Sequence, residues 1–193
     1  FSPHPMFSNF GHRVERADAC KKLGLDAECN YLLFFGLIRE YKGLDLLLEA
    51  FKHVNKDNLK LIVAGEFYES KERYEPLFEA LGERVILHDR FIADADVKYY
   101  FSVADALVLP YRTATQSGVT QIAYNFFTPM IVTDVGGLPE IVPDDRVGYV
   151  TPSTVDGILE AIKSLYEGDN LERFRKNIVK ERKRFSWSTM CDK

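Results

Sequence analysis

Short apolar runs alternate along the chain with segments in which apolar residues recur every three or four positions. Six runs are typical of buried strands: residues 31–35, 59–64, 84–87, 106–109, 130–133 and 148–150. Helical spacing marks the segments around them: residues 14–23, 44–51, 74–81, 97–104, 119–126, 155–166 and 171–185. Because the strands are continuously apolar, the pattern predicts a parallel sheet covered by helices on both faces. The expected fold class is α/β, a doubly wound, Rossmann-like parallel sheet.

Composition changes this picture only by excluding other classes of protein. A chain of 193 residues can bury one substantial core, and 46% hydrophobic with 28% charged residues is ordinary for a globular domain. A net charge of −4 argues against a nucleic-acid binder, and no apolar run approaches the roughly 20 residues of a membrane span. Three cysteines without metal-type spacing predict reduced thiols and a cytoplasmic location. No signal peptide opens the chain, and its first residues suggest an excised domain.

The loop after the first strand, residues 36–43, is the first candidate for chemistry. Ligands of doubly wound sheets bind beyond the carboxyl ends of the strands, near the point where strand order reverses. Arg39 and Lys42 precede a helix that is expected to begin near Gly43. Two cations beside a helix N-terminus suit a diphosphate, although neither a Walker loop nor a dinucleotide fingerprint is present. The alternative is that both side chains are ordinary surface charges.

The second candidate is the polar stretch TATQSGVTQIAY, residues 113–124, which contains no charge. Thr115 or Ser117 could cap the helix that follows, and Gly118 would let a ligand approach the backbone closely. A capped helix explains the stretch when it is taken alone. The functional alternative is a second anion site made of N–H groups and hydroxyls.

Two further loops follow strands. In residues 133–140 the pair Gly136-Gly137 predicts a tight turn into a short helix, which needs no functional explanation. Residues 88–92, which include Phe91, could form a wall for a planar base or pack ordinarily. The four histidines lack partners at ligand spacing, so no metal site is expected, and no catalytic triad is evident. The basic segment 173–184 is interpreted as a solvated helix face, with contact to an anionic membrane as the alternative.

Four motifs together resemble the carboxy-terminal half of a retaining GT-B glycosyltransferase of group 1, glycosyltransferase family 4. They are, in order, FFGLIREYKGLDLLLEAF, AGE, ADALVLPY and DVGGLPE, and the resemblance runs from about residue 4 to residue 187. It implies that residues 1–12 are the remnant of an interdomain hinge. Residues 13–193 would then be the donor-binding domain of a protein whose amino-terminal acceptor domain is absent. Residues 185–187 resemble the point where the last helix turns back toward the other half.

The resemblance implies a nucleotide-diphosphate sugar as the donor and neither a metal nor a separate cofactor. It assigns the diphosphate to a lysine, here Lys42, and to an arginine for which Arg39 is the substitute, because Leu37 stands at the usual position. The family's two glutamates, for donor sugar and ribose, align with Thr113 and Gln121. An amide can still hydrogen-bond a ribose diol, whereas Thr113 leaves the sugar contact without an acid. The donor-binding residues implied in this way are Gly36, Phe91, Thr113, Thr115, Gln116, Ser117, Gly118, Val119 and Gln121.

The chemistry that the resemblance implies is transfer with retention at the anomeric carbon, to an acceptor that the sequence does not identify. Arg39 and Lys42 would stabilise the leaving diphosphate electrostatically, assisted by N–H groups at residues 117–119. The isolated domain is expected to bind donor weakly and to transfer little, and the full-length protein could touch the inner face of the membrane. One alternative is a non-catalytic scaffold or partner-binding domain, since both acids are missing. A nicotinamide-dependent dehydrogenase shares the architecture but lacks its glycine fingerprint here.

Overall fold

One parallel sheet organises the molecule. The computed structural model describes residues 9–185 and contains, within them, six strands in the order β3-β2-β1-β4-β5-β6, with every neighbouring pair parallel. The strands are β1 (Asn30–Phe35), β2 (Leu59–Ala64), β3 (Val85–His88), β4 (Ala106–Leu109), β5 (Met130–Thr133) and β6 (Gly148–Thr151). This is the strand order of a doubly wound, Rossmann-like sheet, so the predicted fold class is confirmed.

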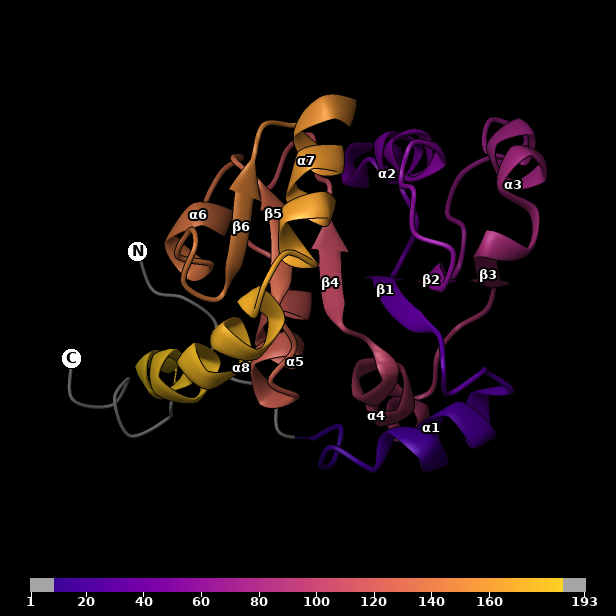
Figure 1. Ribbon diagram of the computed structural model, residues 1–193. Helices are drawn as coiled ribbons and strands as arrows, with labels where there is room; N and C mark the ends of the chain where they lie inside the picture. The colour runs from indigo at the N-terminus through magenta and orange to yellow at the C-terminus, as the bar shows by residue number, and fades with distance from the viewer. Residues whose placement is uncertain (1–8, 186–193) are drawn as a thin grey trace.

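Helices fill the connections along the described part of the chain. They are α1 (Arg16–Leu23), α2 (Leu44–Lys52), α3 (Glu75–Leu81), α4 (Asp94–Val103), α5 (Gly118–Asn125), α6 (Leu138–Ile141), α7 (Val155–Leu165) and α8 (Asn170–Glu181). Short 3₁₀ turns occur at η1 (Glu40–Lys42), η2 (Gly82–Arg84) and η3 (Arg182–Phe185). Figure 1 shows α2 beside α7 and α1 beside α4, the two helix pairs that pack most closely.

Alternate side chains of the strands feed two separate cores, because successive residues of a strand point to opposite faces. Leu33 and Phe35 of β1 lie in the core that includes residues of α1, α4 and α5. Leu32 and Phe34 lie in the core with residues of α2, α3 and α7. Both faces of the sheet are therefore covered, which explains why its strands are apolar without interruption.

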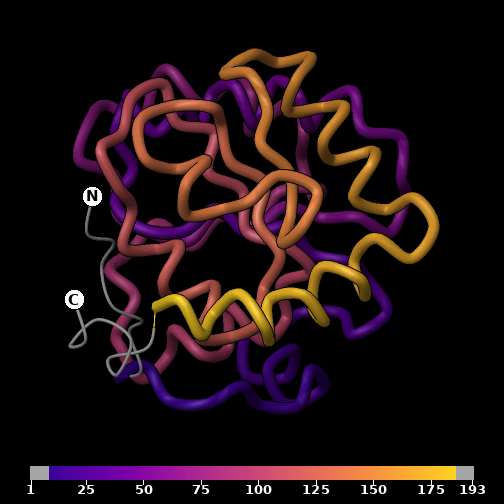
Figure 2. The backbone as a smooth tube through the Cα atoms, turned by 90° about the vertical axis from the view of Figure 1, so that its left-hand side faces the viewer, coloured from indigo at the N-terminus to yellow at the C-terminus, as the bar shows by residue number. Residues whose placement is uncertain are grey.

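Each predicted strand and helix is present, but several bounds differ by one to three residues: α1 begins at Arg16 rather than at residue 14, and α4 begins at Asp94 rather than at residue 97. The strand expected at residues 84–87 begins one residue later, because Arg84 closes η2 and donates hydrogen bonds to the carbonyl oxygens of Phe51 and Val54. The helix expected at residues 171–185 is divided into α8 and η3. Figure 2 shows α8, in yellow, crossing below the orange segment, where Arg173 and Asn177 donate to backbone carbonyls of the loop after α6.

Some predictions concern residues outside the described range. Most of the expected hinge (residues 1–8), Ser186 and Trp187 belong to this group, as do His4 and Cys191. Cys20 and Cys29 are described, and both are free thiols.

Candidate functional site

The carboxyl ends of β1 and β4 meet at the point where strand order reverses. The chain runs from β1 to β2 on one side of this point and from β4 to β5 on the other. The loops that follow β1 and β4 touch each other: a Cβ at Gly43 would lie 2.0 Å from the carbonyl oxygen of Pro110. Since ligands of such sheets bind at the switch point, this junction is the place to search for a site.

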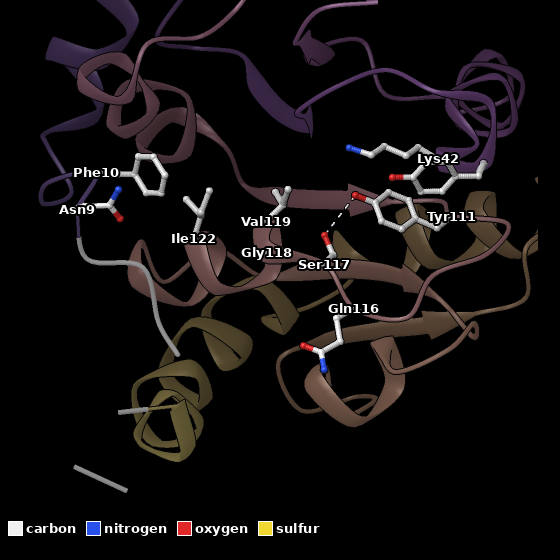
Figure 3. Close-up of a pocket in the computed structure, with 10 residues that line it drawn as sticks. Asn9, Phe10, Lys42, Tyr111, Gln116, Ser117, Gly118, Val119 and Ile122 are labelled. Carbon is white, nitrogen blue, oxygen red and sulfur yellow. Dashed lines mark hydrogen bonds between the residues drawn. The ribbon is translucent and has the colours of Figure 1, made fainter. Parts of the chain in front are cut away.

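A pocket of about 410 Å³ opens at this junction. Its walls come from the segment before α1, the loop after β1, the loop after β4 and the first turns of α5. The lining residues are Asn9, Phe10, Tyr41, Lys42, Tyr111, Gln116, Ser117, Gly118, Val119 and Ile122. In Figure 3, Lys42 lies over Tyr111, and Val119 and Ile122 follow one another along α5, while Gln116 points away from Ser117. The sequence-predicted Lys42 and residues 116–119 are thus brought together, although they are more than 70 positions apart.

Among the described residues that line this pocket, Lys42 is the only one with a charged side chain. Its side chain is only 8% exposed, and its ammonium lies 5.7 Å from the centre of the Tyr111 ring. Within the described residues it has no hydrogen bond or ion pair. Burial, followed by repulsion from Arg39, lowers the pKa of Lys42 to about 8. A buried ammonium without an acidic partner is a site at which an anionic ligand can supply the missing charge.

Tyr111 and Ser117 form the floor of the pocket beside this ammonium. The Tyr111 hydroxyl lies 3.3 Å from the Ser117 hydroxyl, and burial raises the pKa of Tyr111 to about 12. The expectation that Thr115 or Ser117 caps α5 is wrong: Ser117 occupies the N-cap position, but no side chain makes a capping hydrogen bond there. The neighbouring Tyr111 holds the hydroxyl instead, which leaves the first N–H groups of α5 without a side-chain cap.

Gly36 lies close to both Lys42 and Val119. Its φ of +102° is a conformation that other residues rarely adopt, and a Cβ there would lie 3.4 Å from Nζ of Lys42 and 3.8 Å from Val119. A second, smaller hollow of about 200 Å³ begins on the far side of Gly36. Phe91, Leu37 and Glu66 line it, and Phe10 contributes to both hollows. Phe91 is 69% exposed, so its ring is available as a wall.

Four of the predicted site residues line neither of these two hollows. Arg39 is exposed, with its guanidinium 5.3 Å from the centre of the Tyr68 ring. Thr113 and Thr115 are exposed, and the carbonyl of Thr115 accepts from the N–H of Gly137. Gln121 is 1% exposed, and its amide makes no hydrogen bond to any described residue. The helix position on the pocket wall is Ile122, four residues after Gly118.

Sequence reasoning missed five described residues of the pocket lining: Asn9, Phe10, Tyr41, Tyr111 and Ile122. Tyr111 lies two residues beyond the end of β4, and Ile122 shares a helix face with Gly118, so position alone could have found them. It also missed an ion pair between Arg112 and Asp45, which belong to loop and helix segments far apart in the chain. No local pattern signals such a pair.

No group of three or more histidine, cysteine or carboxylate side chains that could hold a metal occurs in residues 9–185. In the same residues, no helix has the length and hydropathy needed to cross a membrane.

The fold and the site together define a Rossmann-like domain with a cationic pocket at its topological switch point. A family model described as "Glycosyl transferases group 1" matches residues 29–168, and the chain belongs to that family. The fold is that of one half of a GT-B glycosyltransferase, as the resemblance of the motifs implied.

Individual comparisons agree with this assignment. A D-inositol 3-phosphate glycosyltransferase of Segniliparus rotundus is 29% identical over 187 residues, which are 92% of this chain and 41% of that protein. The chain spans less than half the length of the first curated relatives it matches. The carboxy-terminal domain of a group 1 family glycosyl transferase from Francisella tularensis superposes with a TM-score of 0.80 at 19% identity, covering 93% of this chain and 97% of that one. Anabaena HepE in complex with UDP-glucose superposes with a TM-score of 0.79 at 18% identity, and the match covers 97% of this chain and 54% of HepE.

Proposed function

We propose that this chain is the donor-binding domain of a glycosyltransferase and that its pocket at the switch point binds the diphosphate of a nucleotide sugar. The observation that carries the proposal is the Lys42 ammonium, buried in the pocket wall without an acidic partner among residues 9–185. The uncapped first turn of α5 adds N–H donors and the positive end of a helix dipole on the opposite side. A diphosphate satisfies both at once.

The adjacent hollow suits the base of the nucleotide. Phe91 offers an exposed ring as a wall, and Gly36, which lines this hollow, lies so close to the pocket of Lys42 that a Cβ on it would be 3.4 Å from the ammonium. The UDP-glucose complex of the structural neighbour HepE supports a nucleotide sugar as the ligand class. The Gln121 amide is free to bind a ribose, but its side chain would have to change rotamer to reach the pocket.

The proposed reaction transfers the sugar with retention of anomeric configuration, without a bound metal and without a cofactor other than the donor. Lys42 stabilises the negative charge that develops on the leaving diphosphate. Arg39, exposed beside the pocket, must swing from its position over Tyr68 to contribute. In this proposal a second, amino-terminal domain of the whole protein binds the acceptor. The whole protein also contacts the inner face of the membrane.

Calorimetry with UDP, GDP and ADP tests donor binding. We expect at least one nucleotide to bind, and Lys42→Met to weaken it by about 10- to 100-fold, the value of a lost charged hydrogen bond of about 1.5–3 kcal/mol. Lys52→Met is the matched control, because Lys52 lies on α2 but pairs with Glu49 at the surface. Binding that is absent for all three nucleotides, or equal in Lys42→Met and the wild type, would contradict the proposal.

A second candidate is a non-catalytic domain that binds the nucleotide but does not transfer sugar. One observation favours it: no described residue that lines the pocket of Lys42 has a carboxylate side chain. A transfer assay with the whole protein separates the candidates. Product with retained configuration that is lost in Lys42→Met supports the transferase, whereas nucleotide binding without any transfer supports the second candidate.

A further inference from the structure

An ion-pair network joins the loop that carries Lys42 to the loop that follows β4. Arg112 donates to both carboxylate oxygens of Asp45, at 2.8 and 2.7 Å, which is a bidentate pair. The same guanidinium donates to the backbone carbonyl of Glu40 at 3.0 Å. The Arg112 N–H donates to the carbonyl of Tyr41 at 2.7 Å. Arg112 therefore makes four hydrogen bonds to residues on both sides of Lys42.

The position of the Lys42 ammonium depends on these bonds of Arg112, because Lys42 has few contacts of its own. Its side chain has no hydrogen bond or ion pair within the described residues, so nothing beyond packing and the Tyr111 ring fixes its ammonium. Its backbone N–H bonds only within its own turn, to the carbonyl of Arg39. The position of the ammonium thus depends on how its loop is held against the β4 loop, which supplies Tyr111.

Arg112 is the hydrogen-bonded connection between these two loops, which also meet where Gly43 approaches the Pro110 carbonyl and where the rings of Tyr41 and Tyr111 lie 6.0 Å apart. Asp45 lies in the first turn of α2, so it connects the β4 loop to a rigid element. Arg73 adds a second cation, 3.5 Å from Asp45 and 3.1 Å from the Glu40 carboxylate. Burial opposes ionisation of Asp45, but its bonds with Arg112 outweigh this and hold its pKa below the ordinary value.

We propose that Arg112, through its bidentate pair with Asp45 and its bond to the Glu40 carbonyl, is a positioning residue that keeps the Lys42 ammonium in the nucleotide pocket. The inference rests on the proposed function for the identity of the ligand. The contacts of Arg112 from which it is argued do not depend on that function. Arg112 lies outside the residues that line the pocket, so it acts through Lys42 rather than on the diphosphate.

The informative variants are Arg112→Lys and Asp45→Asn. Arg112→Lys keeps the positive charge but loses the planar fork, so it cannot hold both Asp45 oxygens and the Glu40 carbonyl together. Arg84→Gln is the matched control, because Arg84 also donates to two backbone carbonyls, at Phe51 and Val54, away from the pocket. It should lower the melting temperature without changing the pocket.

The first readout is the pKa of the Lys42 ammonium, measured by NMR titration of ¹³Cε-labelled lysine. In both variants we expect it to rise from about 8 toward 10.5, as a loosened ammonium gains water. Arg39 is the charged neighbour that also acts on this ammonium, and it is unchanged in both variants. A pKa that stays at the wild-type value in both variants overturns the inference. This readout needs no ligand, so it stands even if no nucleotide binds and the proposed function fails.

The second readout is the affinity for whichever of UDP, GDP and ADP binds the wild type. Arg112→Lys should weaken it about tenfold, since small displacements of a charged contact are costly. In the Lys42→Met background, Arg112→Lys should have no further effect. Losses that add in the double variant would mean that Arg112 contacts the nucleotide directly, and would overturn the positioning role.

Discussion

At the scale of single residues, Lys42 combines two properties that pull in opposite directions. Its burial lowers its pKa from 10.5 to about 8, so the unliganded fold disfavours the charged form. Diphosphate binding needs that same form. As pH rises above about 8, the free pocket loses its proton, and affinity for a diphosphate should fall by up to about tenfold per pH unit.

Calorimetry with the bound nucleotide between pH 6.5 and 9.5 checks this prediction. The second ionisation of a phosphate lies near pH 6, so the ligand itself is constant over the upper part of this range. Lys42→Met should bind weakly at every pH, without a bend near 8. A wild-type affinity that is flat up to pH 9.5 would be inconsistent with the lowered pKa.

Stability of the unliganded chain should change with pH in the opposite sense. Between pH 8 and 10.5 the unfolded chain keeps the Lys42 proton while the folded chain has lost it, so the contribution of this group to stability rises with pH. Below pH 8 the full penalty is present, on the order of 3 kcal/mol. Lys42→Met should therefore raise the free energy of unfolding at pH 7 while it weakens nucleotide binding, and urea unfolding measures the change in stability.

At the scale of elements, Gly43 connects η1 to α2 and sets the approach of the two loops. Its φ is +67°, and a Cβ would meet the Pro110 carbonyl oxygen at 2.0 Å. Gly24 ends α1 with a φ of +68° and has nothing within 4 Å of the same position. Gly24→Ala should lower the free energy of unfolding by about 1–2 kcal/mol, the cost of placing an alanine in the left-handed conformation. Gly43→Ala should lower the free energy of unfolding by clearly more, and it should also weaken nucleotide binding.

Urea unfolding and calorimetry on this pair of variants separate backbone strain from loop contact. Equal losses of stability, with unchanged affinity in Gly43→Ala, would show that the contact with Pro110 does not shape the pocket. The comparison is controlled internally, because both glycines share the same backbone conformation and differ only in what surrounds them.

The elements also show what the sequence could predict. Continuous apolar strands and helical spacing determine the parallel sheet, because burial on both faces leaves no other pattern. The loops after β1 and β4 follow from the general location of ligands at the switch point. The failure of Ser117 to cap α5 could not be foreseen, since it depends on Tyr111 reaching the same hydroxyl. The pair of Arg112 and Asp45 escapes prediction for the same reason: its partners are 67 positions apart.

At the scale of the whole molecule, the side chains at the carboxyl ends of the strands differ in their pairing from those at the amino ends. The carboxyl ends of the strands hold the pocket and Lys42, which forms no ion pair with any described residue. At the amino ends, Asp105 lies just before β4 with a side chain 9% exposed, and it accepts from the Tyr31 N–H at 3.0 Å. Arg16 and Arg175 lie 3.5 and 3.4 Å from the same carboxylate, which brings α1 and α8 onto the sheet. The buried carboxylate at the amino ends of the strands is therefore paired with cations, whereas the Lys42 ammonium at the carboxyl ends can still bind an anion.

This division predicts opposite effects for two charge-removing variants. Asp105→Asn should lower the free energy of unfolding by about 3 kcal/mol, because it leaves two partly buried guanidinium groups without their anion. It should leave nucleotide affinity within about twofold of the wild type, since Asp105 is remote from the pocket. Lys42→Met should do the reverse, with a weakened nucleotide affinity and a higher free energy of unfolding. Measuring unfolding and calorimetry for both variants tests the idea, and a parallel loss of affinity in Asp105→Asn would mean that the two ends of the strands are coupled through β4.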